Sequence, residues 1–425
     1  MALLLLLACP DDSSGATFPA ADLVRFDGAA LAEGVYDPRE GDVVVQAATA
    51  DGHDWALALR DGEVIAGVPE AGELRRYRLD GTDVSEGEVL GSAGLSGRYG
   101  AAVSVNGAVV VIGAPATDGG PDAAQAGAVQ VLGDETVEAV AYAGDSAQGR
   151  LGGVVAACAD IDGDGVAEVA AAALWEADLA GRVYVGSADG SAELAVVEGV
   201  RPNERFGAAI ECAYDRFSDG GSDLLVGAPF GVSADGTTLG GYVAAFDAAA
   251  VAAGSPQFTL GSRTGDVDGF GSALASCRLR STGLRDLVVG APLANGGAGA
   301  AYVYFGGTGL SAASFPAVTL PGEGTDARFG AHLGCGDLDG DGLDELFVGA
   351  PGLDSAAGNH DVGALYVYRG LGTSSGTFTT TAAHHVFTAD RAFLRTGERF
   401  VVGDLDADGK AEVVLLVRQR APSGE

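Results

Sequence analysis

The chain has 425 residues, of which 47% are hydrophobic, and 59 acidic side chains against 24 basic ones give it a formal net charge of −35. This apolar content excludes an intrinsically disordered chain. The acidic excess argues against nucleic acid or an anionic lipid surface as a partner, because both attract Lys and Arg. The 69 glycines lie among short runs rich in β-branched residues, which predicts many tight turns between short strands.

The chain begins with a short apolar run, MALLLLLAC, that ends at Cys9. The run is too short to cross a bilayer and is similar to the signal peptide of a bacterial lipoprotein, in which such a cysteine is acylated. We therefore predict a signal peptide at 1–9, lipidation of Cys9, a flexible tether at 10–21 and an exported body at 22–425. The predicted location is the bacterial cell envelope or surface, with secretion as the alternative, and the lipid is the only expected membrane contact.

A repeated unit accounts for most of the remaining chain. The segment RFGAHLGCGDLDGDGLDELFVGAP at 328–351 has several counterparts, a truncated copy near the C-terminus and a degenerate first copy. These lie at 98–115, 150–174, 205–229, 269–292, 399–417 and 55–69. The aromatic or leucine marker of each unit falls at 55, 99, 151, 206, 270, 329 and 400, so neighbouring markers are 44 to 71 residues apart. This spacing is too long for the rung of a simple solenoid.

Each unit contains four short β-runs bounded by Gly or Pro. In the fifth unit they are FGSALASC, DLVVG, GAAYVYFGG and PAVTLPG, between residues 270 and 322. Four strands per unit are typical of a propeller blade, and radial repetition protects sheet edges from unwanted pairing. The sequence therefore predicts an all-β fold, a seven-bladed β-propeller of four-stranded antiparallel blades.

The seventh blade is expected to be shared between the two ends of the chain. The last unit supplies only two strands, and 21–28 and 42–48 contain two β-runs that would complete it. Pairing of these N-terminal strands with the C-terminal hairpin would close the ring. The predicted blades are 55–97, 98–149, 150–204, 205–268, 269–327, 328–398, and 399–425 together with 22–48.

The units resemble FG-GAP repeats, the blades of the integrin α-subunit propeller and its bacterial relatives. The resemblance covers nearly all of 22–425 and rests on Phe-Gly pairs at 206–207 and 329–330. It rests also on the triplet Gly-Ala-Pro, which lies at 113–115, 227–229, 290–292 and 349–351. The first unit has Gly-Val-Pro instead, and the third and seventh units lack the triplet.

An acidic pattern, D-x-D-x-D-G-x-x-[DE], occurs three times between the first two β-runs of a unit. Calcium prefers about six to eight oxygen ligands, which closely spaced carboxylates in a turn supply. The sixth-position glycine permits the sharp reversal, the seventh-position carbonyl is expected to face the ion, and the ninth residue opens the next strand. The predicted ligands are Asp160, Asp162, Asp164, Val166 and Glu168; Asp337, Asp339, Asp341, Leu343 and Glu345; and Asp404, Asp406, Asp408, Lys410 and Glu412.

We expect about three calcium ions, each holding one hairpin turn. One alternative is a dockerin-like pair, which needs two close copies flanked by helices, and another is a capped turn without metal, in which the carboxylates would repel one another. Two related turns depart from the pattern. Residues 215–223 retain three acids but place Phe217 at a ligand position, and the fifth unit has Arg278 and Arg280 there, so we predict no tight metal site in either.

Four cysteines occupy nearly the same place, late in the first strand, of four consecutive units. Export favours disulfides, and equivalent positions on neighbouring inner strands could lie close together. Of the three possible pairings, we expect Cys158–Cys212 and Cys277–Cys335. Four buried free thiols are the alternative.

No catalytic residue is predicted. Residues 372–376 match G-x-S-x-G, but no helix follows, as a nucleophile elbow requires. The longer loops at 116–127, 230–240 and 352–363 join second to third strands and should gather on one face, opposite the acidic turns. In integrins this face engages ligand, so the resemblance agrees. The predicted contacts are Phe230, Asp235, Asn295, His360 and Asp361.

The expected function is therefore a non-enzymatic, calcium-stabilised and surface-tethered propeller that binds an extracellular protein or glycan. A secreted hydrolase or lyase, with an active site in the central pocket, is one alternative. A purely structural component of the cell envelope is another.

Overall fold

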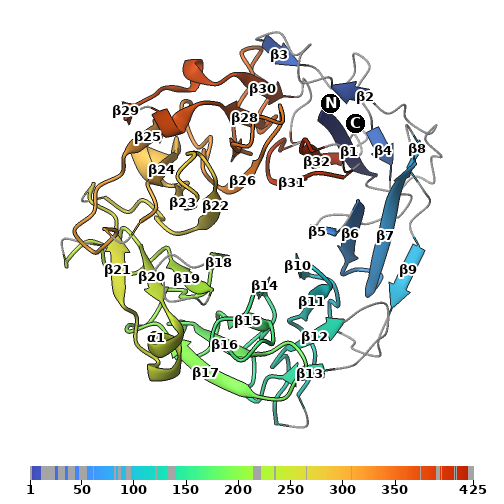
Figure 1. Ribbon diagram of the computed structural model, residues 1–425, viewed down its shortest axis with the longest axis vertical. Helices are drawn as coiled ribbons and strands as arrows, with labels where there is room; N and C mark the ends of the chain where they lie inside the picture. Colours follow the sequence, from blue (N-terminus) through green and yellow to red (C-terminus); the bar gives the residue numbers. More distant parts are fainter. Residues whose placement is uncertain are drawn as a thin grey trace.

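The computed structural model describes most of the chain beyond residue 54 and several short N-terminal strands. The described residues are 2–10, 24–26, 34–36, 44–46, 55–60, 62–80, 83–84, 88–91, 97–119, 122–132, 140–213, 222–233, 236–264, 266–307, 309–373, 375–388, 393, 395–405, 407 and 409–419. Small sheets stand radially around a central opening, which Figure 1 shows end-on. The predicted all-β propeller is thus confirmed, and helices are confined to α1 (Ala248–Ala253) and the 3-10 turns η1 (Ala294–Gly297), η2 (Leu371–Thr373) and η3 (Thr380–Ala382) within these residues.

Among the described residues, six sheets form antiparallel blades of consecutive strands. Blade 1 contains β5 (Ala56–Arg60), β6 (Glu63–Val68), β7 (Glu73–Asp80), β8 (Asp83–Val84) and β9 (Glu88–Gly91). Blade 2 contains β10 (Ala102–Asn106), β11 (Val109–Ala114), β12 (Ala128–Leu132) and β13 (Val140–Ala143). Blade 3 contains β14 (Val154–Ala157), β15 (Glu168–Ala173), β16 (Arg182–Ser187) and β17 (Glu193–Glu198).

The other three blades repeat this order. Blade 4 contains β18 (Ala209–Ala213), β19 (Asp223–Ala228), β20 (Tyr242–Phe246) and β21 (Phe258–Gly261). Blade 5 contains β22 (Ala273–Cys277), β23 (Asp286–Ala291), β24 (Ala300–Tyr304) and β25 (Val318–Pro321), with β29 (Gly376–Thr377) parallel to β25. Blade 6 contains β26 (His332–Gly336), β27 (Glu345–Ala350), β28 (Ala364–Tyr368) and β30 (His385–Thr388), with β3 (Gly34–Tyr36) parallel to β30.

The predicted seventh blade is wrong, because the strand that pairs with the C-terminal hairpin comes from residues 2–10 and runs parallel to it. The C-terminal hairpin, β31 (Arg399–Gly403) and β32 (Glu412–Gln419), pairs in parallel with β1 (Ala2–Pro10). The short strands β2 (Val24–Phe26) and β4 (Val44–Gln46) pair with β1 and not with the hairpin. The predicted ring closure through 22–48 is therefore not confirmed. The side chain of Cys9 lies outside the described residues, so the signal peptide, tether and lipidation stay predictions.

Side chains of the C-terminal hairpin contact the blades on both sides of it. The Phe400 ring lies 4.6 Å from the His332 ring and 6.4 Å from the Phe347 ring of blade 6, between centroids. On the other side, Val414 and Leu416 pack in one cluster with Trp55 of the first unit. The hairpin therefore occupies the sector between blades 6 and 1.

Glycines at the junctions explain why the two halves of the repeat motif recur together. The glycine that begins each Gly-Ala-Pro triplet meets the glycine that follows the marker of the next unit. A Cβ on Gly349 would lie 2.0 Å from the Gly397 carbonyl oxygen, so only glycine permits this contact. The residue before Gly397 is Thr396, which is buried. Thr396 forms an isolated β-bridge with Gly363, and the marker Phe329 forms the equivalent β-bridge with Gly299. The last marker is therefore 396 and not 400, because a threonine replaces the expected aromatic residue.

Disulfides connect inner strands of neighbouring blades. The structure joins Cys158 to Cys212 and Cys277 to Cys335, the pairs expected from the sequence, with Cα atoms 5.1 and 5.5 Å apart. The first pair links blade 3 to blade 4, and the second links blade 5 to blade 6. Within the described segments, no helix combines the length and apolar composition needed to cross a membrane.

Candidate functional site

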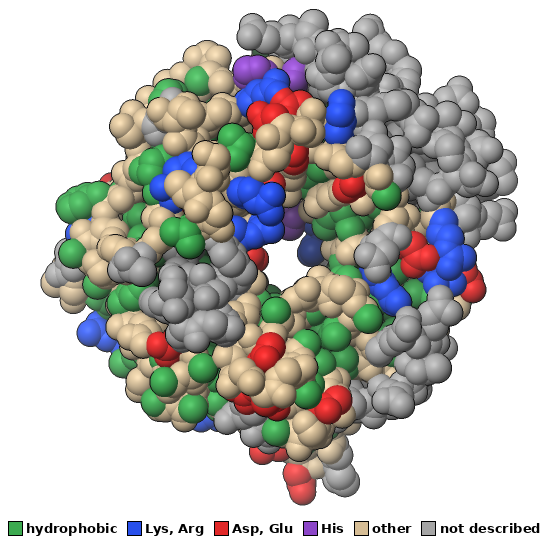
Figure 2. All heavy atoms as spheres, in the orientation of Figure 1, with side chains coloured by type: hydrophobic (Ala, Val, Ile, Leu, Met, Phe, Trp, Pro, Cys, Tyr) green, Lys and Arg blue, Asp and Glu red, His purple; other side chains and the backbone are tan. Residues whose placement is uncertain are grey.

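Acidic turns follow the inner strands β14, β26 and β31 and lead into β15, β27 and β32. Figure 2 looks onto the face that carries them, where acidic side chains gather over blades 3 and 6 around the central opening. Three carboxylates of each of two turns lie close together, with ligand oxygens within 4.8 Å of one another. These sets are Asp160, Asp162 and Glu168, and Asp337, Asp339 and Glu345.

Backbone amides hold the aspartates of both turns in place. Asp160 accepts hydrogen bonds from the amides of Gly163 (2.6 Å) and Gly165 (2.9 Å). Asp337 does the same with Gly340 and Gly342, both at 2.7 Å. Each first-position carboxylate thus lies at the centre of its turn and accepts the amide hydrogen bonds of the residues around it. Asp side chains favour such local hydrogen bonds with the backbone over strand pairing.

The ninth-position glutamate closes each turn from the first residue of the second strand. Its Oε2 atom accepts a hydrogen bond from the amide of the second residue, which donates from Ile161, Leu338 and Leu405 in the three turns. These second residues are buried and apolar, so they anchor the turn to the core. Our sequence interpretation missed them, although the apolar residue between the first two aspartates is a readable signal.

Glu168 has an unsatisfied buried oxygen. Its side chain is 0% exposed, and its Oε1 atom has no hydrogen-bond partner among the described residues. Burial raises the pKa of Glu168 to about 7, against the hydrogen bond from Ile161, and the neighbouring aspartates raise it further. Burial likewise raises the pKa of Glu345 to about 7. A divalent cation would satisfy the free oxygen and offset the repulsion, so the all-oxygen donor set fits calcium.

The third acidic turn is described only in part. Asp404 accepts from the amide of Gly409 at 2.9 Å, which matches the first-position contacts of the other two turns. Asp406 and Asp408 lie outside the described residues. In the fourth blade Asp223 is the first residue of β19 and is fully buried, while Asp215 and Asp219 lie outside the described residues.

The fifth blade carries a cation of its own in the equivalent turn. Residues 278–286 have the same nine-residue spacing, and the ninth residue, Asp286, is fully buried. Arg280 donates from Nε (2.9 Å) and Nη2 (2.5 Å) to Asp286 Oδ1, and its Nη2 also donates to the Gly306 carbonyl. Arg280 therefore places a positive charge at the third position of its own turn, where the acidic turns carry an aspartate.

A second arginine reaches the acidic turn of blade 6. Arg369 follows the last residue of β28, and its guanidinium contacts Asp339 and lies 3.5 Å from Glu345 Oε1. These are the third and ninth positions of the turn, the same positions that Arg280 and Asp286 occupy in blade 5. Sequence spacing could not reveal Arg369, because a different strand brings it to the turn.

The predicted ligand contacts lie in loops at the opposite edge of the blades, which we call the loop face. Asn295 is exposed and donates to the Gly299 carbonyl at 3.2 Å, and the Phe230 ring lies 5.3 Å from the guanidinium carbon of Arg205. His360 is exposed and its Nδ1 atom lies 3.1 Å from an Asp354 carboxylate oxygen.

Asp361 also contacts Asp354, whose carboxylate accepts from its amide at 2.9 Å. Asp235 lies outside the described residues. These contacts hold the loops in shape, and the roles of the residues in binding remain predictions.

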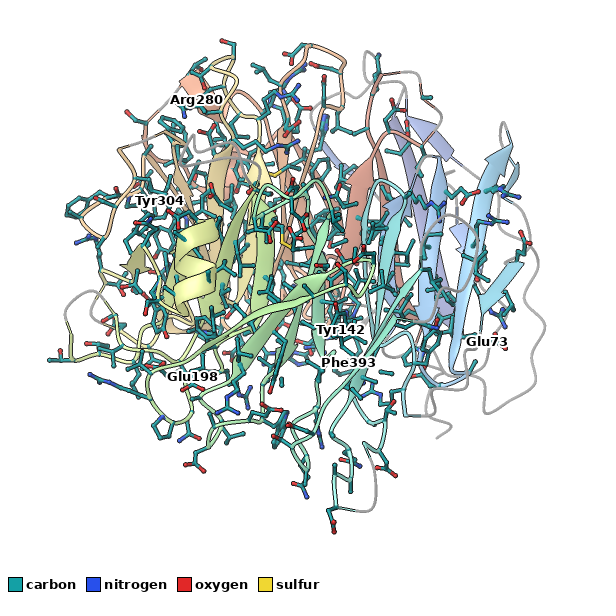
Figure 3. The ribbon with its side chains drawn as sticks, turned by 60° about the horizontal axis from the view of Figure 1, so that its bottom comes forward. Glu73, Tyr142, Glu198, Arg280, Tyr304 and Phe393 are labelled. Atoms are coloured by element: carbon teal, nitrogen blue, oxygen red, sulfur yellow. A yellow bond between two sulfur atoms is a disulfide. The ribbon has the colours of Figure 1, made fainter. Side chains whose placement is uncertain are left out.

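The loop face also carries exposed apolar side chains that the sequence interpretation did not single out. They lie either in connections from the second to the third strand or in connections from one blade to the next. They are Trp175, Val200, Leu239, Val267, Leu293 and Phe393. In the described part of the chain, only Val89, Val196 and Phe315 are large, exposed, apolar and elsewhere in their blades. Figure 3 labels Arg280, from the blade 5 turn, near the top of the view and Phe393 in its lower half.

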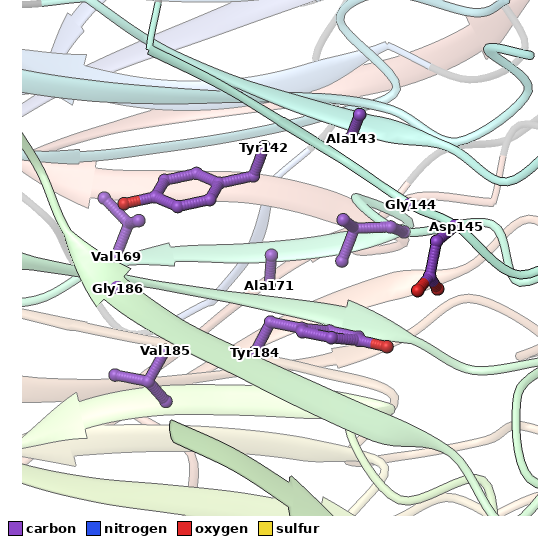
Figure 4. A pocket seen from close by; sticks show the side chains of 10 residues that line it. Tyr142, Ala143, Gly144, Asp145, Val169, Ala171, Tyr184, Val185 and Gly186 are labelled. Carbon is purple, nitrogen blue, oxygen red and sulfur yellow. The ribbon is translucent and has the colours of Figure 1, made fainter. Parts of the chain in front are cut away.

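A cavity of about 140 Å³ separates blades 2 and 3 (Figure 4). Tyr142 and Tyr184 line it, but both hydroxyls are used within the protein. Tyr142 donates to the Ser187 carbonyl at 2.7 Å, and Tyr184 donates to Glu176 Oε2 at 2.6 Å. Because its polar groups are satisfied, this space is a packing gap between blades.

A family model described as an FG-GAP-like repeat matches residues 337–415, which include two of the acidic turns. The chain is an integrin-α-like FG-GAP propeller. This confirms the resemblance inferred from the repeated Phe-Gly and Gly-Ala-Pro motifs.

Relatives of this FG-GAP propeller include integrin α-subunits and a phospholipase. Integrin alpha-2 of Bos taurus is 32% identical over 189 residues, which are 41% of this chain and 16% of the integrin. Phosphatidylinositol-glycan-specific phospholipase D of Mus musculus is 35% identical over 161 residues, 35% of this chain and 19% of the enzyme. The propeller thus matches less than a fifth of the length of each relative.

Among solved structures, hydrazine synthase of Kuenenia stuttgartiensis has a TM-score of 0.48 at 11% identity, covering 76% of this chain and 78% of that one. A likeness at this level says nothing about function.

Proposed function

We propose that this FG-GAP propeller is a non-enzymatic recognition module whose loop face binds an extracellular protein or glycan. The observation that carries the proposal is the set of exposed apolar side chains on that face, from Trp175 to Phe393. Exposed apolar surface marks interaction sites, and six of the nine large, exposed apolar side chains among the described residues lie on this face. The integrin relatives and the inter-blade disulfides support an exported protein. Anchoring through a lipid on Cys9 is part of this proposal.

Calcium is proposed as the structural ion of this module. The turns at 160–168, 337–345 and 404–412 would each hold one ion through the carboxylates at their first, third, fifth and ninth positions and the seventh carbonyl. Bound calcium would cross-link the two innermost strands of its blade and offset the charge of the buried glutamate. The chain's own contribution is the set of amide hydrogen bonds that orients each carboxylate before an ion arrives.

Binding to an array of purified glycans and surface proteins would test the recognition role. We expect a ligand whose binding is lost in a Trp175→Ser, Leu239→Ser double variant and is retained in a Phe315→Ser variant, because Phe315 is exposed elsewhere. Equal binding by all three proteins would contradict the loop-face assignment.

A hydrolase is the second candidate, because a phospholipase D is among the relatives. A broad screen for ester, phosphodiester and glycoside hydrolysis would separate the two roles. Turnover that the purified propeller sustains would overturn the non-enzymatic proposal.

A further inference from the structure

The inner strands leave one side of their backbone unpaired around the central opening. Each of β5, β10, β14, β18, β22, β26 and β31 stands at the end of its sheet, so half of its amide and carbonyl groups face away from its partner strand. A cavity of about 380 Å³ lies among the beginnings of these strands. Because the acidic turns follow the ends of the same strands, this cavity opens toward the loop face.

The first residue of each inner strand lines this cavity. Seven equivalent positions therefore surround it, and five of them carry small apolar side chains. The seven residues are Ala56, Ala102, Val154, Ala209, Ala273, His332 and Arg399. The two polar residues sit on neighbouring strands, and none of the described residues lining the cavity is acidic.

Arg399 is left without a carboxylate partner among the described residues. Its Nε atom is buried and makes no hydrogen bond there. This is unusual in a chain with 59 acidic and 24 basic side chains, where Arg182 and Arg280 are each bonded to carboxylates. A guanidinium pairs with a carboxylate through two parallel N–H donors, and Arg399 has no such partner among the described residues.

His332 lines the cavity as a neutral side chain. Its Nε2 atom donates to the Phe400 carbonyl at 2.9 Å, and its ring packs edge-on against the Phe400 ring. Burial lowers the pKa of His332 to about 4, against this hydrogen bond, and the nearby charge of Arg399 lowers it further. The positive charge of the cavity therefore belongs to Arg399 alone.

We propose that this cavity binds a carboxylate-bearing sugar, such as the uronic acid end of an extracellular glycan. The sugar carboxylate pairs with Arg399, and its hydroxyls bond to the unpaired backbone groups of the inner strands. The cavity volume falls within the roughly 300–1,000 Å³ of small-molecule sites and exceeds the need of a single acidic side chain. This inference rests on the proposed recognition function and names the ligand class for the same face.

Titration calorimetry of the full chain with D-glucuronate, D-glucose and an acidic peptide would test the inference. We expect glucuronate to bind and the other two to bind at least about tenfold more weakly, a difference of about 1.4 kcal/mol. Arg399→Met keeps much of the side-chain length and should lose glucuronate binding by at least that factor. Arg201→Met removes an exposed charge from a connection between blades and should bind as the wild type does.

Several outcomes would overturn the inference. They are equal binding of glucuronate and glucose, no binding of glucuronate, preference for the acidic peptide, or unchanged binding in the Arg399→Met variant. If that variant fails to fold, the Arg399 Nε–H resonance of the wild-type protein replaces it, and it must shift with glucuronate and not with glucose. Array binding that persists in Arg399→Met but fails in the Trp175 and Leu239 variant would leave the proposed function standing without this ligand class.

Discussion

At the scale of single residues, the buried glutamate at the ninth position constrains the acidic turns most. Glu168 is buried and lies beside the aspartates of its own turn, and both effects raise its pKa. In the absence of metal it therefore holds a proton near neutral pH. The sequence pattern predicted that carboxylates would gather in these turns, and in two of the turns three of the predicted carboxylates do lie together. It could not predict Arg369, because that contact depends on which strand neighbours the turn.

The raised pKa values predict opposite pH dependence with and without calcium. The folded, metal-free protein binds protons on Glu168 and Glu345 up to about pH 7, whereas unfolded glutamates, with an ordinary pKa of 4.5, release them at lower pH. The metal-free protein should therefore lose stability as pH rises from about 4.5 to 7. Stabilisation by calcium should grow over the same range, because binding requires the ionised carboxylates.

Thermal melting between pH 5 and 8, in calcium-free buffer and in millimolar calcium, would measure both trends. A Glu168→Gln, Glu345→Gln variant serves as control and should flatten the two curves. Parallel curves for the wild type in both buffers would contradict the assignment of these glutamates as ligands.

The ion pair of Arg280 with Asp286 should stabilise the blade 5 turn independently of calcium. Removing one partner of a buried ion pair costs about 3–5 kcal/mol, because the other charge is left buried. We expect Arg280→Met to lower the free energy of unfolding by about 3 kcal/mol, since Asp286 is fully buried and Arg280 partly exposed. Urea unfolding with calcium and with EDTA should give the same loss. A loss seen only in EDTA would show that this turn depends on metal after all.

At the scale of elements, the sequence predicted the four-strand order of blades 2 to 6, because glycine or proline marks the ends of the β-runs. It failed at the last sheet for a physical reason. The parallel pairing of β1 with β32 joins residues 4–10 to 413–419, and no turn signal marks a partner so distant in sequence. The last marker was misplaced at Phe400, because Thr396 keeps the junction geometry without an aromatic ring.

The disulfides predict stabilisation of the junctions between blades. Each closes a loop, with partners 54 and 58 residues apart. Loss of one such bond should cost about 4 kcal/mol by the loop-entropy relation. Denaturation of a Cys158→Ala, Cys212→Ala variant would measure it, with reduced wild-type protein as comparison. A variant as stable as the oxidised wild type would show that the bond contributes little to the folded ring.

At the scale of the whole molecule, the radial plan followed from the repeat spacing and the strand count, but the number of blades did not. Within the described parts of the chain, six blades and one sheet built from both chain ends surround the opening. The sequence gives no direct measure of how strands from the two ends combine. The sequence also could not indicate that Arg399 lines the central cavity. Arg399 occupies the same place in its inner strand as Ala56 and Ala102 do in theirs, which becomes visible only when these strands are aligned in space.

Calcium removal should loosen parts of the ring unequally. Each proposed site adds about 4 kcal/mol when free calcium is about 1,000 times its Kd. Hydrogen exchange in EDTA should therefore speed up at 160–168, 337–345 and 404–412 and stay unchanged at 278–286, where Arg280 supplies the charge. Uniform acceleration of exchange around the ring would contradict this division.

The glycine contact at each junction has an evolutionary consequence. One half of the contact follows a marker and the other begins a triplet, so the repeats at 98–115, 205–229, 269–292 and 328–351 each carry both halves. Duplicating or deleting a repeat would join the same two surfaces again. The number of blades could therefore change between related genes without a new interface between blades.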